Sequence, residues 1–173
     1  MSLQIKPEEY INSLNEVIGQ NLTLDEYSAT QFEYMERLVL LRFDEADGVC
    51  IIHIHLTRLE EAALPNILGD LLEANFMFSN TQGGSLSWSR ETRMAAINFL
   101  LPLTDTDQMV FLNRLNNMLA VSDAWVKQIE KINKDAIDAA AKRLTELREG
   151  TKFDPTTITQ NDVLENSGAI IRA

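Results

Sequence analysis

The chain has 173 residues and a formal net charge of −11 at pH 7, with 26 acidic and 15 basic residues. Binding to nucleic-acid phosphates needs clustered Lys and Arg, and anionic membrane surfaces repel an acidic chain, so we expect neither partner. No apolar run is long enough for a membrane span, and no signal peptide is recognised, so we expect no membrane insertion. The single cysteine, Cys50, excludes an internal disulfide framework and suits a reducing cytosol.

The acidic residues are concentrated near the N-terminus. Residues 1–48 contain ten acidic and three basic residues, which amounts to a net charge of −7 in this third of the chain. A field of this sign favours basic or neutral partners and keeps a protein in solution.

The first half of the chain predicts one helix and three strands. Pro7 suits the first helical position, acidic residues follow it, and Gly19 is a stop signal, so we expect a helix over residues 7–18. Alternation of apolar and polar residues then predicts strands over residues 31–34, 38–43 and 49–56. Short turns, one of them at Glu36-Arg37, join these strands into an antiparallel meander.

The second half predicts a helix, two strands and a long helix. Pro65 begins a helix over residues 65–74, strands follow over 85–89 and 94–101, and Thr104 caps a helix over about 104–149. We therefore expect an α+β fold, with one domain over residues 1–149 and a polar tail over 150–173 that is disordered unless docked. The last helix is too long for this domain to cover, so its Ala-rich second half either projects or packs on a partner chain.

The residues that could perform chemistry form no recognisable catalytic motif. His53 and His55 share one strand face, but the sequence has no third histidine, and Cys50 points to the opposite face. We expect two ordinary sheet histidines, a buried structural cysteine, no metal or cofactor, and no catalytic residue. A small enzyme that uses His53 and His55 stays open as an alternative.

Apolar residues occupy both faces of the second strand. Val39, Leu41 and Phe43 fill one face, and Leu38 and Leu40 fill the other. A strand that is apolar on both sides needs cover on both sides. We therefore expect this sheet to meet either a second copy or another chain, unless these side chains merely fill the core of a monomer.

Several segments resemble the class I type III secretion chaperones, the Tir chaperone (CesT) family. The resemblance covers about residues 5–135. The segments that carry it are Leu71-Leu72-Glu73-Ala74-Asn75-Phe76-Met77-Phe78, Gly83-Gly84 with the Leu86/Trp88 strand, Asn98-Phe99-Leu100-Leu101-Pro102-Leu103, and Ala124-Trp125-Val126. The predicted order of helices and strands is also that of the family.

This resemblance implies a bacterial cytoplasmic homodimer without enzymatic activity. Such chaperones bind the N-terminal chaperone-binding region of secreted effectors in an extended conformation, keep them soluble and secretion-competent, and present them to the secretion apparatus and its ATPase. The implied effector-binding residues are Ile11, Leu14, Ile18, Val39, Leu41 and Phe43. The implied dimer residues are Leu68, Leu71, Leu72, Phe76, Leu86 and Trp88. The extended last helix and the tail lie outside what the resemblance explains.

A second hypothesis is an acidic regulatory interaction protein, such as an anti-activator or a decoy that sequesters a basic partner. A complex driven by charge weakens steeply with ionic strength, whereas a complex driven by an apolar groove weakens much less. Salt dependence therefore separates the two functions.

Overall fold

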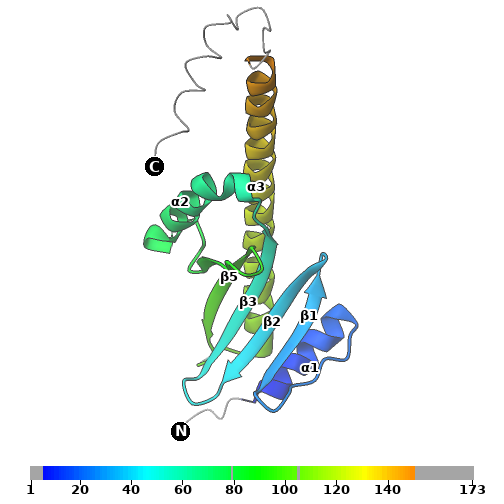
Figure 1. Ribbon diagram of the computed structural model, residues 1–173. Coiled ribbons are helices and arrows are strands. Elements are labelled where there is room, and N and C mark those ends of the chain that lie inside the picture. The colour runs from blue at the N-terminus through cyan, green and yellow to red at the C-terminus, as the bar shows by residue number, and fades with distance from the viewer. Residues whose placement is uncertain (1–5, 79, 105, 151–173) are drawn as a thin grey trace, which may run out of the picture. The chain divides into compact units, whose positions relative to one another are not determined.

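The computed structural model describes residues 6–78, 80–104 and 106–150. Within these ranges, helices, 3-10 turns and strands follow the predicted α+β order (Figure 1). They are α1 (Pro7–Ile18), β1 (Ala29–Tyr34), β2 (Arg37–Asp44), β3 (Val49–Arg58), η1 (Glu61–Ala63), α2 (Leu64–Asn75), η2 (Phe76–Phe78), β4 (Ser85–Trp88), β5 (Met94–Pro102) and α3 (Gln108–Gly150). The chain divides into two compact units, Met1–Ile137 and Asp138–Ala173. The tail predicted from residue 150 onward lies outside the described residues, except for Gly150 at the end of α3.

The five strands form one antiparallel sheet in the order β1-β2-β3-β5-β4. The first three strands form the predicted meander, with Phe32 opposite Val39 and Val39 opposite Ile54. β5 then pairs with β3, and β4 pairs with the other side of β5. As a result, β1 and β4 are the two edges of the sheet.

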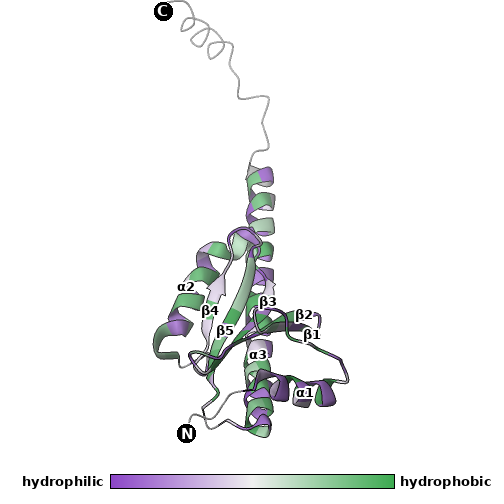
Figure 2. Ribbon diagram, turned by 90° about the horizontal axis from the view of Figure 1, so that it is seen from below, coloured by the Kyte–Doolittle hydropathy of each residue, from purple (hydrophilic) through white to green (hydrophobic). Residues whose placement is uncertain are grey.

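One face of the sheet carries the core. Along β3 the buried residues are Cys50, Ile52, Ile54 and Leu56, which confirms the predicted alternation. α1 and the first part of α3 cover this face (Figures 1 and 2). The Tyr10 ring of α1 lies 5.0 Å from the Phe111 ring of α3 and 6.1 Å from the Phe43 ring of β2, measured between ring centroids. The hydroxyl of Tyr10 also donates to the carbonyl of Thr106 at 2.6 Å.

The opposite face of the sheet is only partly covered. Leu38 and Leu40 of β2 are half-buried there, together with Val49, Ile51, His53 and His55 of β3. On β5, Leu100 is exposed on the same face. β2 is therefore apolar on both faces. One face is covered, and the other is in partial contact with solvent.

Two local details differ from the sequence prediction. The turn after β1 is Met35-Glu36 rather than Glu36-Arg37, because Tyr34 already pairs with Arg37. The cap of α3 is Asp107 rather than Thr104, since the Asp107 carboxylate accepts the N–H of Val110 at 2.8 Å.

Gly84 of the predicted glycine pair has a steric role. A Cβ placed on Gly84 would lie 2.6 Å from the Phe99 ring, so only glycine allows the chain to pass this closely before β4 begins.

Candidate functional site

The edge of the sheet at β1 has free backbone groups. Ala29 shows which way the backbone faces, because its N–H donates to the Asp25 carboxylate at 2.8 Å and its carbonyl accepts the N–H of Asp25 at 2.9 Å. Both groups point away from β2. Backbone groups along an antiparallel strand alternate with a period of two, so those of Gln31 and Glu33 also point away from β2. No hydrogen bond to these outward groups occurs within the ranges that the structure describes.

A cavity and two exposed apolar side chains border this edge. The cavity has a volume of about 500 Å³ and is lined by β1 residues and by the loop that follows α1. Tyr27 precedes β1 and Met35 follows it, and they are 72% and 68% exposed. Elsewhere, Val17 of α1 is 68% exposed. We call the outward backbone of Gln31 and Glu33, together with Tyr27 and Met35, the β1 edge site.

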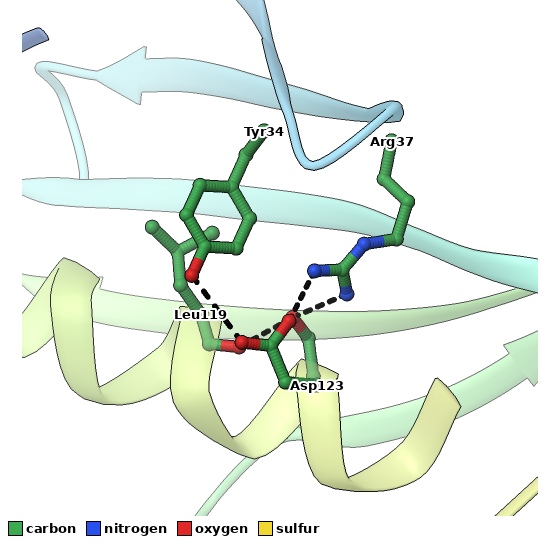
Figure 3. Close-up of polar contacts among 5 residues, drawn as sticks. Tyr34, Arg37, Leu119 and Asp123 are labelled. Atoms are coloured by element: carbon green, nitrogen blue, oxygen red, sulfur yellow. Dashed lines mark hydrogen bonds and ion pairs between the residues drawn. The ribbon is translucent and has the colours of Figure 1, made fainter. Parts of the chain in front are cut away.

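Polar contacts hold the β1–β2 hairpin against α3 (Figure 3). The Arg37 guanidinium forms an ion pair with the Asp123 carboxylate and donates to the Ser122 hydroxyl at 3.1 Å. The Tyr34 hydroxyl donates to the other Asp123 oxygen at 3.3 Å, and the Arg37 guanidinium lies 5.3 Å from the Tyr34 ring centre. These contacts tie both strands of the hairpin to one turn of α3, so the β1 edge is held in place at its far end.

The hairpin turn itself is conformationally demanding. Met35 and Glu36 have φ angles of 47° and 62°, in the left-handed region. A two-residue turn with positive φ at both positions matches the twist of the flanking strands, but it costs residues other than glycine about 1–2 kcal/mol each. The Arg37–Asp123 contacts offset part of this cost, and the turn presents Met35 to solvent.

The opposite edge of the sheet is capped at one residue. The Asn75 amide donates to the carbonyl of Leu86 at 3.0 Å and its oxygen accepts the N–H of Leu86 at 2.7 Å. Asn75, the last residue of α2, thus takes the hydrogen bonds that a neighbouring strand would make to Leu86 of β4. The two edges therefore differ, because the middle of the short strand β4 is capped by α2, whereas the outward groups of Gln31 and Glu33 on β1 have no such cap among the described residues.

The predicted effector-binding residues lie beneath this edge rather than on it. Ile11 and Leu14 of α1 and Val39, Leu41 and Phe43 of β2 are all buried in the core, and Ile18 is partly buried. The structure brings these six side chains together, and their contact with a partner stays a prediction. The sequence pattern did not mark Val17, Tyr27 and Met35 as surface residues, since it does not indicate whether another element covers an apolar side chain.

The predicted dimer residues are divided between core and surface. Leu71 and Leu86 are buried, and Leu68 and Trp88 are partly buried. Leu72 and Phe76 are 73% and 75% exposed, and the neighbouring Met77 is 78% exposed. Met77 and Phe78 also have left-handed backbone conformations, which turn the chain after α2. We call Leu72, Phe76, Met77 and Phe78 the α2 end surface.

The groups that could perform chemistry are held in unreactive settings. Burial raises the pKa of the Cys50 thiol to about 12, so this cysteine carries little thiolate at neutral pH. His53 contacts the Asn98 side-chain oxygen at 2.6 Å, and burial, with His53 nearby, lowers the pKa of His55. Among the described residues no three His, Cys, Asp or Glu side chains are grouped so that they could hold a metal ion. In that same part of the chain, no helix is long and apolar enough to cross a membrane.

Comparison with known proteins gives relatives for this fold. A chain in the crystal structure of the ExsC–ExsE complex is similar over 75% of this chain and 97% of its own length, with a TM-score of 0.64 and 17% identity. The HopA1–SchA chaperone–effector complex matches over 72% of this chain and 91% of its own, with a TM-score of 0.55 and 12% identity. The Yersinia pestis type III secretion chaperone SycH, in complex with a fragment of YscM2, matches over 69% and 98%, with a TM-score of 0.54 and 11% identity.

The sequence itself gives the family. A search of curated proteins found no significant match. The model of the Tir chaperone protein (CesT) family, however, matches residues 9–126, which include most of α1, the whole sheet, α2 and the first part of α3. This confirms the resemblance and the helix–strand order predicted from the sequence. The chain belongs to the Tir chaperone protein (CesT) family.

Proposed function

We propose that this protein is a type III secretion chaperone. It binds the N-terminal chaperone-binding region of a secreted effector in an extended conformation, keeps the effector soluble and secretion-competent, and directs it to the secretion apparatus and its ATPase. Family membership supports this function, and so do the structural relatives that are chaperones in complex with bound proteins.

The free backbone groups along β1 support an effector-binding site at this edge of the sheet. An extended peptide can add to a sheet edge, where backbone hydrogen bonds supply affinity and pockets for alternate side chains supply specificity. Gln31 and Glu33 offer those backbone groups, and the cavity beside them has room for side chains of the added strand. Tyr27 and Met35 provide apolar contacts at the two ends of the strand.

Charge favours one class of effector segment. Asp25, Glu33 and Glu36 lie in or beside β1, in the third of the chain that carries a net charge of −7. A basic or neutral segment is attracted to this edge, and an acidic one is repelled. Apolar side chains on the segment would complement Tyr27 and Met35.

The remaining features of the proposal follow from the family. We propose that the chaperone acts as a homodimer in the bacterial cytoplasm, with the α2 end surface in the dimer interface, and that it has no enzymatic activity. A dimer would cover Leu72 and Phe76, which the single chain leaves exposed.

A proline at position 31 tests strand addition at β1. Gln31→Pro removes only the outward N–H, and an edge strand tolerates proline where its N–H faces solvent. The matched control, Gln31→Thr, changes the side chain and keeps the N–H. We expect the proline variant to bind the N-terminal region of a co-encoded secreted protein at least tenfold more weakly than the threonine variant, measured by isothermal titration calorimetry.

Thermal unfolding of both variants shows whether the fold is kept. Melting temperatures within a few degrees of each other indicate that both variants are folded, whereas a much lower value for the proline variant would indicate that it is not. Equal affinity of the two variants would show that β1 receives no strand. Failure of the unaltered chaperone to bind any co-encoded secreted protein would remove the function itself.

A further inference from the structure

The C-terminal half of α3 has no counterpart in the family match. The matched residues end at Val126, while α3 continues to Gly150. The structural relatives are covered over 91% to 98% of their own length, whereas they cover only 69% to 75% of this chain. This added helix is therefore a feature of this chain, and the chaperone function does not account for it.

Packing of α3 on the sheet ends at Asn133. Ile129 is fully buried, and the Asn133 amide binds the backbone at the end of β3, donating to the carbonyl of Arg58 at 2.8 Å and accepting the N–H of Glu60 at 3.0 Å. From residue 134 to residue 148 all side chains are exposed, apart from the partly buried Ala136 and Ala140. We call residues 134–148 the α3 extension. Helices in water owe most of their stability to packing, so exposed apolar side chains such as Ile137 and Leu144 suggest a partner for this part of the helix.

An apolar seam runs along the α3 extension. Ile137, Ala140, Leu144 and Leu147 recur at spacings of three and four residues, which are the a and d positions of two heptads. Ile137 is 48% exposed and Leu144 is 61% exposed. This spacing is the pattern that packs against a second helix.

The charges beside the seam have one sign. In this register Lys134, Arg143 and Arg148 occupy the flanking e and g positions, so each charged residue beside the seam is basic. The acidic residues Asp135, Asp138 and Glu146 lie at the b, c and f positions, away from the seam. Glu146 pairs there with Lys142 at 4.0 Å. In a chain with a net charge of −11, this basic border is a local reversal of sign.

We propose that the α3 extension binds an amphipathic helix of another protein whose own apolar seam is flanked by acidic residues. The basic border argues against a second copy as the occupant. In a parallel pair of these helices, Arg143 of each copy would face Arg148 of the other, and an antiparallel pair would again place basic residues together. An acidic flank on the partner turns each of these repulsions into an ion pair.

Two synthetic helices test the proposal on the full-length protein. Both have three heptads with Ile at a and Leu at d; one has Glu at e and g, and the other has Lys there. We expect the Glu-flanked peptide to bind at least tenfold more tightly than the Lys-flanked peptide in fluorescence anisotropy. The variant with Arg143→Glu and Arg148→Glu should reverse this preference.

Point variants locate the binding to the seam. Leu144→Gln removes an apolar seam residue but keeps a good helix former, and should abolish binding of the Glu-flanked peptide. Thr145→Gln, on the side away from the seam, should leave binding unchanged. Circular dichroism checks that both variants keep their helix content.

Three results would overturn the proposal. Equal or absent binding of both peptides would show that the border does not select a partner. Disulfide cross-linking of two copies through Leu144→Cys, with Cys50 buried and unreactive, would assign the seam to a second copy. Tighter binding of a peptide comprising residues 151–173 would assign it to the tail of this chain.

Discussion

Arg37 brings a positive charge to a nearly buried position at the base of the β1–β2 hairpin. Its side chain is 9% exposed, and the side chain of its partner Asp123 is 26% exposed. Because Arg37 also donates to Ser122, and Asp123 also accepts from Tyr34, each charge has more than one polar contact. A buried charge that loses its partner is far more costly than an exposed one, so these residues determine how firmly the hairpin is attached to α3.

Removal of the carboxylate should therefore destabilise the fold more than removal of the guanidinium. We expect Asp123→Asn to lower the free energy of unfolding by about 2–4 kcal/mol, since it leaves Arg37 buried without its counter-ion. Arg37→Met should cost less, because Asp123 retains access to water. Glu146→Gln, which breaks the exposed Lys142 pair, is the control and should change the value by no more than about 0.5 kcal/mol. Urea denaturation measures all three, and an Asp123→Asn effect no larger than the control would contradict this view.

In each of α1, α2 and α3, one asparagine side chain binds backbone groups outside its helix. Asn15 of α1 binds both the N–H and the carbonyl of Leu22, Asn75 of α2 does the same for Leu86, and Asn133 of α3 binds Glu60 and Arg58. A side-chain amide has a donor and an acceptor side by side, so it can replace a strand at one residue. At β4 this caps the edge of the sheet at Leu86.

Two substitutions at Asn75 separate its two hydrogen bonds. Asn75→Asp keeps the acceptor for the Leu86 N–H but loses the donor for the Leu86 carbonyl, whereas Asn75→Ala loses both. We expect each variant to lose about 1–3 kcal/mol of unfolding free energy. Hydrogen exchange should show faster exchange of the Leu86 amide in the alanine variant than in the aspartate variant. Unchanged stability and unchanged exchange in both would mean that Asn75 does not hold the edge.

For the molecule as a whole, two surfaces of different character lie on opposite edges of the sheet. The β1 edge site combines free backbone groups with a negative field, and the α2 end surface is apolar, with Leu72, Phe76 and Met77 more than 70% exposed. Contiguous apolar surface of this kind marks an interaction site on a soluble protein. We assign the first to the effector and the second to the proposed dimer.

A charge in the α2 end surface tests the dimer. We expect the unaltered protein to sediment at twice its 19.6 kDa mass at micromolar concentration. The variant with Leu72→Glu and Phe76→Glu should sediment as a monomer, because burial of two carboxylates in an apolar interface is unfavourable. Val17→Glu places the same charge at an exposed position of α1, outside the α2 end surface, and should leave the mass unchanged. A 19.6 kDa species for the unaltered protein would refute the homodimer.

The order of the helices and strands could be predicted from the sequence alone. Helical and strand periodicities are local, so Pro7 and Gly19 bound α1 correctly, and the alternation along β3 placed Cys50 in the core. The family resemblance also came from short segments, such as the one that ends α2. The two misplaced boundaries, at the Met35-Glu36 turn and the Asp107 cap, each lie within a few residues of the prediction.

Which residues are core, and which edge has free backbone groups, depends on how the elements pack together. Val39, Leu41 and Phe43 have the same alternating pattern whether they line a groove or a core, and they are buried because α1 and α3 cover their face of the sheet. The edges depend on β5 pairing with β3 and on β4 lying outside β5, where Asn75 caps Leu86. These pairings join residues far apart in the chain, and a local pattern contains no information about which distant strand will satisfy a backbone group.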